Sequence, residues 1–496
     1  MNGFQRISGA RGVPPPPSDI QALQPDTVIE ESKTPSNKQP LNTASEEITN
    51  LLHLVSEITT NLTNLSIASD DALRIKTATS ALKLAALVRP PQDTIMSLFA
   101  NMSTVSAIRL FTHWDGFNHI PSNPEGISCS SLAAKCNASE SLLRRITTML
   151  TSSRILHHVS PTHISHTRTS LLLRSSEPMA AMFSLLYTNI VEVGTILPEY
   201  LDTNGKKEPV GPENVPASFL AGQPDLGYFE LLQKDEERMK GFMKAMSLTS
   251  HRRVPITGMY DMDLLFKKML EAAEKEEEKE DRPRKERVVW VDVGGGEGHI
   301  LNLFREEYPR LRRAKCAVMD LKPVIEEAKK KKKKKQKKLA AETSVELVEQ
   351  YYQNVEFVAG DFMRDIPVKK AMVYYLRHVL RDYSDPVATV ILKNIAEAMA
   401  EDSRVLISEQ INNSNNPSSS PSPSSGVGGA ALPLYAAFKD FSMLSIGGKE
   451  RSLEDFERIA GDAGLRVEGL WRDKDKATPQ GVLELVLRES GGGSDE

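Results

Sequence analysis

A strand-like apolar run followed at once by three glycines constrains the fold of this chain most strongly. Residues 288–293 read Val-Val-Trp-Val-Asp-Val, and residues 294–296 are all glycine. An apolar run of this kind is typical of a strand buried on both faces of a parallel sheet. A helical pattern begins at about His299, so the glycines occupy the turn between a strand and a helix. The pattern predicts an α/β domain whose strand ends lie at a ligand site.

The same alternation of strand and helix continues to the end of the chain. Further strand-like segments end at Asp320, Asp361, Leu376 and Glu409, and helical segments separate them. This order predicts a Rossmann-like, doubly wound α/β sheet over residues 288–488, with residues 482–487 as an edge strand.

Two polar insertions, at 329–345 and 411–430, interrupt the predicted sheet domain. Residues 329–338 are nine lysines and one glutamine. We interpret them as a solvated loop that repels itself into disorder. A localisation signal or a nucleic-acid patch is the alternative interpretation.

The chain before the sheet is predicted to be mainly helical. Residues 1–44 are poor in large apolar side chains, which predicts a disordered tail, as for residues 489–496. Residues 45–200 hold helices, including one at 71–88 and a helix-turn-helix pattern at 128–146 with a possible wing. Residues 201–287 form a helical linker and substrate-side segment with a charged insertion.

The helix-turn-helix pattern has two interpretations, a DNA-binding module or a packing and dimerisation module. Its second helix offers only Arg144 and Arg145 as cations, and the net charge of the chain is −4. We therefore favour the packing module and expect no nucleic-acid partner.

Composition narrows the remaining classes of protein. The three cysteines form no CxxC pair, which argues against a disulfide framework and a metal site. No signal-peptide core or run of about 18 apolar residues is visible, so we expect a cytoplasmic protein without a membrane span.

Glycines and carboxylates at successive strand ends predict a nucleoside site. Gly294 and Gly296 match a dinucleotide fingerprint, but its third glycine is replaced by His299, which argues against NAD. An acid ending the second strand suits ribose hydroxyls, and an acid beside an aromatic ring suits adenine. Together they favour an adenosine ligand without phosphates. The candidate residues are Asp292, Gly294, Gly295, Gly296, Asp320, Asp361 and Phe362.

Over residues 45–487 the chain resembles the plant caffeic-acid-type and fungal secondary-metabolite O-methyltransferases. The motifs that carry this resemblance are Val291-Asp292-Val293-Gly294-Gly295-Gly296-Glu297-Gly298-His299, Gly360-Asp361-Phe362, Tyr374-Tyr375-Leu376-Arg377-His378 and Gly447-Gly448-Lys449-Glu450-Arg451. The resemblance implies an N-terminal winged-helix-like dimerisation domain and a homodimer.

The resemblance also implies S-adenosyl-L-methionine as cofactor and a small-molecule substrate. The glycine turn would hold the methionine part, Asp320 the ribose, and Asp361 with Phe362 the adenine. Arg377 stands where the family has a basic residue near the cofactor. Residues 164–167, with His166, resemble a family segment on the substrate side.

The family's general-base position departs from the pattern. Relatives carry a histidine followed by aspartate, whereas this chain has Arg381 followed by Asp382. Arginine stays protonated near neutrality and is no general base. His378 is a less favoured replacement, while the two supporting acids of the family are retained as Glu409 and Glu450.

Three functions remain open at this point. The favoured one is O-methylation of a small aromatic or polyketide-type secondary metabolite, with Arg381 stabilising the oxyanion of an acidic hydroxyl. The alternative is a pericyclase on the same fold, in which Arg381 and His166 donate hydrogen bonds to a carbonyl in a dehydration or cycloaddition. The third is a non-catalytic dimeric binding protein.

Overall fold

The computed structural model describes residues 41–65, 71–250, 260–267, 287–342, 353–412, 431–472 and 480–488. The chain divides into two compact units, residues 1–53 and 54–496. Of the first unit only the beginning of helix α1 (Leu41–Leu65) is described, so this helix starts within the segment expected as a tail. Most of the two expected tails, the charged insertion and the insertion at 411–430 lie outside the described residues.

A mixed sheet forms the centre of the C-terminal part. Its strand order is β10-β11-β8-β7-β4-β5-β6, with β9 paired to β8. The strands are β4 (Trp290–Val293), β5 (Cys316–Asp320), β6 (Val355–Ala359), β7 (Val373–Arg377), β8 (Arg404–Asn412), β9 (Arg451–Ser452), β10 (Leu465–Arg472) and β11 (Gln480–Leu487). Strands β4 to β8 run parallel to one another, which confirms the predicted Rossmann-like α/β sheet.

The far end of the sheet differs from the expectation. Strand β11 pairs antiparallel with both β8 and β10, so β11 is internal and β10 is the edge strand. The near-continuous burial of β11 agrees with an internal position, whereas in β10 only Leu465 is buried and the other residues are partly or fully exposed. Only a strand covered on both faces needs a continuous apolar run.

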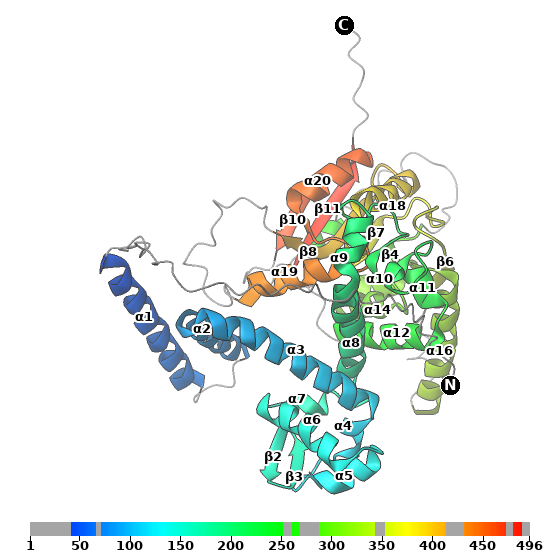
Figure 1. Ribbon diagram of the computed structural model, residues 1–496. Coiled ribbons are helices and arrows are strands. Elements are labelled where there is room, and N and C mark those ends of the chain that lie inside the picture. The colour runs from blue at the N-terminus through cyan, green and yellow to red at the C-terminus, as the bar shows by residue number, and fades with distance from the viewer. Residues whose placement is uncertain are drawn as a thin grey trace, which may run out of the picture. The chain divides into compact units, whose positions relative to one another are not determined.

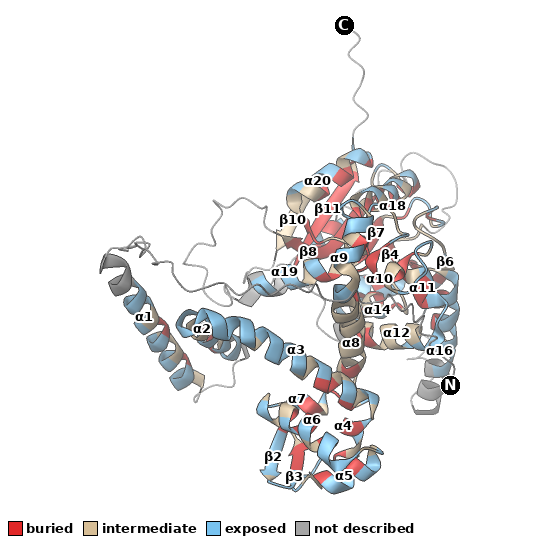
Figure 2. Cartoon of the chain, viewed as in Figure 1, coloured by how far each residue is buried: buried red, intermediate tan, exposed pale blue. Residues whose placement is uncertain are grey.

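Helices cover both faces of the sheet (Figure 1). Helices α18 (Asp385–Ala398) and α20 (Leu453–Asp462) pack on one face, where Ile391 and Phe456 join Val293 and Ile407 in one apolar core. Helices α14 (His299–Glu307), α15 (Pro309–Arg313) and α16 (Lys322–Glu342) belong to the core of the other face, around Trp290. Figure 2 shows the resulting buried strands between more exposed helices.

The lysine run lies in helix α16 and not in the solvated loop that we expected. Lysine is a good helix former, so repulsion between the ammonium groups is opposed by backbone propensity. Two contacts hold the described part of the run against the sheet domain. Lys331 Nζ lies 2.5 Å from Glu297 Oε1, and Lys332 Nζ stands 5.3 Å from the centre of the Phe357 ring.

The helix-turn-helix segment forms a small module with its own apolar core. It comprises α3 (Pro91–His113), α4 (Gly116–His119), β1 (Ile127–Ser128), α5 (Cys129–Lys135), α6 (Glu140–Ser152), β2 (Leu156–Ser160), β3 (His163–His166) and α7 (Arg168–Leu171). The three strands form an antiparallel sheet, which supplies the expected wing. Arg144 on the second helix is paired with Glu140, at 2.6 Å between Nη2 and Oε1. This pairing weakens the DNA-binding interpretation further.

Several helices link this module to the sheet domain in sequence. They are α8 (Pro178–Leu186), the π-helical η1 (Tyr187–Glu192), α9 (Val193–Thr203), α10 (Pro216–Leu220), α11 (Tyr228–Gln233) and α12 (Glu236–Ser250). Tyr228, Val215 and Ile446 share an apolar core, so the linker helices contact the segment that follows α19 (Ala431–Leu444).

Apolar side chains are exposed on the N-terminal helices. Helix α2 (Asp71–Val88) exposes Leu82, and α3 exposes Met96 and Phe99, each by more than half. By length and composition alone, the segments Pro91–His113 and Pro178–Thr203 of the described chain could cross a membrane. Apolar helices of proteins that never enter a membrane pass the same test, so this observation is weak.

Candidate active site

The glycine turn after β4 leaves space for a ligand. Gly294 and Gly296 have φ angles of 71° and 58°, in the left-handed region that favours glycine. A Cβ on Gly295 would lie 2.6 Å from Cγ of Asp292, whereas a Cβ on Gly296 would meet nothing within 4 Å. The turn is therefore packed against the protein at Gly295 and open at Gly296.

Asp320, at the end of β5, holds this turn. Its Oδ2 accepts a hydrogen bond from the Gly296 backbone N–H at 2.8 Å, and its Oδ1 accepts one from the Leu321 N–H at 2.7 Å. Burial raises the pKa of Asp320, and these two hydrogen bonds oppose the rise. Backbone amides thus orient the carboxylate. Each of its two oxygens keeps a second lone pair that can accept a hydrogen bond from a ligand.

Two buried polar atoms at the same edge of the sheet have no hydrogen-bond partner among the described residues. They are Oδ2 of Asp292 on β4 and Nε of Arg377 at the end of β7. Burial raises the pKa of Asp292 to about 7, and the positive charge of Arg377 opposes this rise. Buried polar groups are normally satisfied, so these two atoms are available to bind the polar groups of a ligand.

Asp361 and Phe362 follow β6 as predicted. Oδ1 of Asp361 accepts a hydrogen bond from the Met363 N–H at 3.0 Å. The Phe362 ring lies edge-on to Tyr383, at 5.8 Å between ring centres, and 3.7 Å from the Cβ position of Gly294. The ring therefore stands beside the glycine turn, where it can pack on a flat ligand group.

The base position lies on a single turn of 3-10 helix, η2 (Leu380–Asp382). Arg381 is largely buried, and its Nη1 lies 2.9 Å from Oε1 of Glu450. This contact is an ion pair that lacks the alignment of a hydrogen bond. Nε and Nη2 of Arg381 also lie 3.4 and 3.3 Å from Sδ of Met443 on α19. The guanidinium is held in one place by two different segments.

Glu409, inside β8, supports the backbone of this turn. Its Oε1 accepts from the Leu380 N–H at 3.1 Å, and its Oε2 lies 3.6 Å from Nδ1 of His378. His378 has a φ of 53°, and burial lowers its pKa although the Glu409 carboxylate opposes the shift. His378 thus faces the supporting acid, as a neutral ring at neutral pH.

The pKa values of two acids beside Arg381 are raised toward neutral pH. Burial raises the pKa of Asp382 and of Glu450 to about 7 each, and in both cases the positive charge of Arg381 opposes the rise. The Glu409 carboxylate also raises the pKa of both acids, and Glu450 raises the pKa of Asp382. Groups with pKa values near 7 exchange protons readily at physiological pH.

Sequence reasoning missed the residues that helices bring to this site. Met443 contacts Arg381 from α19, and Phe229 on α11 lies 6.0 Å from the Tyr383 ring, between centres. Tyr228 accepts a hydrogen bond from Nδ2 of Asn189 at 3.0 Å, and burial raises its pKa to about 12. No motif marks these residues in the sequence.

A pocket between η1, α9 and α19 is lined by Asn189, Ile190, Val193, Gly194, Leu197, Phe441, Leu444 and Ser445.

His166 is occupied within the winged module. One ring nitrogen lies 2.9 Å from Oγ of Ser170 and the other 3.2 Å from the carbonyl oxygen of Ile120. Burial lowers its pKa. These contacts give His166 a role in holding β3, and its substrate-side role stays a prediction. In the described part of the chain, no group of three or more His, Cys, Asp or Glu is arranged for a metal ion.

Comparisons with known proteins place the chain among methyltransferases. An O-methyltransferase domain family matches residues 285–466. Methyltransferase pynC of Aspergillus niger is 33% identical over 402 residues, which are 81% of this chain and 98% of that protein.

Two solved structures share the fold. One is OxaC in complex with SAH and oxaline, with a TM-score of 0.68 and 22% identity over 89% of this chain and 100% of that one. The other is described as a pericyclic reaction enzyme, with a TM-score of 0.67 and 21% identity over 88% and 100%.

Proposed function

Because this chain belongs to the O-methyltransferase family, whose cofactor is S-adenosylmethionine, we propose that it methylates an acidic hydroxyl of a small aromatic or polyketide-type metabolite. The observation that carries the choice of an acidic hydroxyl is the permanent cation at residue 381, paired with Glu450. A hydroxyl that ionises readily needs the least help from a base.

The residues at the strand ends fit the cofactor. Gly296 faces open space, and Asp292 and Arg377 present buried polar atoms without partners. We assign the methionine part to the glycine turn and Arg377, the ribose to Asp320, and the adenine to Asp361 and Phe362. When bound, S-adenosylmethionine supplies an electrophilic methyl group on a positively charged sulfur.

Arg381 and its neighbouring acids provide the remaining chemistry. The guanidinium of Arg381 stabilises the oxyanion of the acceptor, which lowers the pKa of the hydroxyl. The departing proton passes to a carboxylate oxygen of Asp382 or Glu450, whose pKa values of about 7 suit this task. Glu409 holds the turn through the Leu380 amide. The acceptor oxygen would thus be held as an anion for the methyl group that the bound cofactor would supply.

The test uses a series of small phenols and enols with graded acidity. S-adenosylhomocysteine release is measured for the wild-type chain and for Arg381→His. We expect the wild type to prefer acceptors with a pKa below about 8. The histidine variant should gain at least tenfold on acceptors with a pKa near 10, because a general base is typically worth about 10² to 10⁴ in rate. Equal wild-type rates across the series would contradict the oxyanion role of Arg381.

Pericyclic catalysis is the second candidate, and the same residue favours it. A buried arginine that cannot take a proton is suited to donate hydrogen bonds to a carbonyl and polarise it. One solved structure with this fold is described as a pericyclic reaction enzyme. An isomerised or dehydrated product formed without S-adenosylhomocysteine would favour this candidate. If the chain binds the cofactor but forms no product, the third candidate function, a non-catalytic binding protein, would be favoured.

We further infer a homodimer in the cytoplasm. The exposed apolar residues of α2 and α3, among them Leu82, Met96 and Phe99, are what a second copy of the chain would cover. All three cysteines are free, which suits a reducing compartment. Analytical ultracentrifugation of the full chain without detergent tests this inference, because a monomer at micromolar concentration would contradict it.

A further inference from the structure

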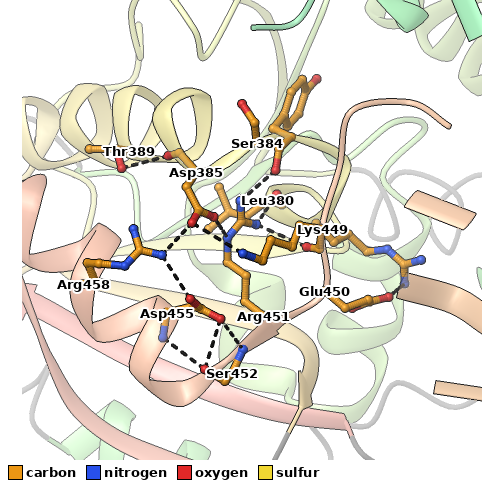
Figure 3. Close-up of polar contacts among 12 residues, drawn as sticks. Leu380, Ser384, Asp385, Thr389, Lys449, Glu450, Arg451, Ser452, Asp455 and Arg458 are labelled. Atoms are coloured by element: carbon orange, nitrogen blue, oxygen red, sulfur yellow. Dashed lines mark hydrogen bonds and ion pairs between the residues drawn. The ribbon is translucent and has the colours of Figure 1, made fainter. Parts of the chain in front are cut away.

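Arg451 binds the ends of the turn that carries the base position. It is almost completely buried, and its guanidinium uses all three nitrogens. Nη1 donates to the Leu380 carbonyl oxygen at 2.7 Å, and Nη2 donates to the Tyr383 carbonyl oxygen at 2.7 Å. Nε donates to Oδ1 of Asp385 at 2.9 Å (Figure 3). The first carbonyl belongs to the first residue of η2, and the second belongs to the residue that follows its end.

The geometry of these bonds defines the position of the turn. A planar guanidinium presents its N–H groups in a fixed fork, so two carbonyl oxygens bound to it have a fixed separation. Between those carbonyls stand Arg381, whose guanidinium contacts Glu450 and Met443, and Asp382, whose Oδ1 lies 3.8 Å from Nε of Arg381. A single 3-10 turn has few internal bonds of its own, because i to i+3 bonds are poorly aligned.

The neighbouring strand segment adds a second attachment. The Lys449 N–H donates to the Arg381 carbonyl oxygen at 2.8 Å. A Cβ on Gly448 would lie 2.2 Å from the same oxygen, so the two backbones are in direct contact. The motif that supplies the acid Glu450 thus also holds the backbone of Arg381.

Asp385 anchors Arg451 from the other side. It also contacts Nη2 of Arg458 at 2.6 Å and Nζ of Lys449 at 3.9 Å. Burial would raise the pKa of Asp385, but these cations hold it below its ordinary value, so Asp385 stays ionised. Arg451 therefore keeps its anchor throughout the neutral range.

We propose that Arg451 is a positioning residue, which sets where Arg381 and Asp382 stand toward the substrate without touching the substrate itself. The inference concerns the reaction at the proposed active site and therefore rests on the proposed function. It assigns a task to the last residue of the Gly-Gly-Lys-Glu-Arg motif that is separate from the task of Glu450.

The first test is a double-mutant cycle with Arg451→Lys and Arg381→Met. Lysine keeps the charge but cannot bind two carbonyl oxygens in a fork. We expect Arg451→Lys to lower kcat about 100-fold with KM changed less than threefold, because small misplacements of a reacting group cost about this much. In the Arg381→Met background the same change should lower kcat less than threefold. If Arg451→Lys lowers kcat by the same factor in the wild-type and in the Arg381→Met background, the proposal is overturned.

Arg458→Met is the matched control. Arg458 bonds to Asp385 and Asp455 in the same network, but it is exposed and does not contact the turn (Figure 3). We expect it to keep kcat within threefold of the wild type. An equal loss of kcat in Arg458→Met and Arg451→Lys would mean that general disruption of the network is responsible, and this would overturn the proposal.

A second readout does not depend on turnover. The Asp382 and Tyr383 amides donate to the carbonyls of Val379 and Leu380, at 3.1 and 3.2 Å. In Arg451→Lys their hydrogen exchange should quicken at least tenfold, while strands β4 and β7 stay protected. Unchanged exchange in the turn would overturn the proposal.

These readouts separate failure of the inference from failure of the proposed function. Absence of S-adenosylhomocysteine with the wild-type chain refutes methyl transfer. The kinetic cycle is then run on the isomerisation reaction, and if no reaction is found the exchange result alone decides the inference.

Discussion

Glu450→Gln should make the protein more stable and less active at alkaline pH. The Glu450 carboxyl is fully buried, and burial raises its pKa from 4.5 to about 7 despite the ion pair with Arg381. A group whose pKa is raised by folding stabilises the native state below its unfolded pKa. That stabilisation is lost as the pH rises through the folded pKa. The wild type should therefore lose stability between about pH 4.5 and pH 7.

The magnitude follows from the size of the pKa change. A rise from 4.5 to about 7 corresponds to about 3 kcal/mol, since each pKa unit is worth roughly 1.4 kcal/mol. Glutamine resembles the protonated acid, so the variant should match the wild type near pH 4. At pH 8 it should exceed the wild type by up to about 3 kcal/mol. Its methyl transfer should fall, because Arg381 loses its anionic partner.

Urea unfolding at pH values from 4 to 8 measures the difference. Glu297→Gln is a control of opposite sign, because hydrogen bonds and charges from His299 and Lys331 lower the pKa of Glu297 to about 2. A pKa lowered by folding stabilises the native state above pH 4.5, so this variant should be less stable than the wild type at pH 8. If Glu450→Gln is also destabilised at pH 8, the ion pair with Arg381 outweighs burial and the reasoning is wrong.

Three further predictions concern the cofactor turn, the motif backbone and the dimer. Asp320→Asn should weaken S-adenosylmethionine binding at least tenfold in calorimetry, because charge-assisted hydrogen bonds are worth about 1.5–3 kcal/mol; unchanged affinity would contradict the ribose assignment. Gly448→Ala should lower the free energy of unfolding by about 1–3 kcal/mol in urea, because its Cβ would lie 2.2 Å from the Arg381 carbonyl oxygen. A variant as stable as the wild type would show that this contact relaxes freely. Phe99→Glu on α3 should shift sedimentation toward the monomer, and an unchanged dimer would place the interface elsewhere.

The strand ends could be predicted from sequence because each is marked by a local pattern. A continuous apolar run followed by glycine or an acid located Asp292 and Asp320 at one edge of the sheet, whereas Arg377 was implied by the family resemblance. Position on a strand end largely determines where such a side chain lies. The candidate cofactor residues therefore came together as expected, although their roles remain proposals.

The substrate side was harder to predict because it depends on tertiary packing. Met443 reaches Arg381 from a helix that no motif marks, and the π-helical η1 has no recognised signal. Arg451 was visible in the motif, but sequence alone does not show that its guanidinium turns inward to two carbonyl groups. The lysine run was wrongly predicted to be a disordered loop, because that prediction considered the repulsion between its charges but not the helix propensity of lysine.

The exposed apolar residues of α2 and α3 have a consequence for mass action. If a second copy covers them, the folded state depends on the concentration of the chain, as it does in an obligate dimer. The thermal midpoint should then rise with protein concentration, and turnover per chain should decline on dilution into the nanomolar range. Activities measured at different enzyme concentrations would be comparable only after the fraction of associated chains is known.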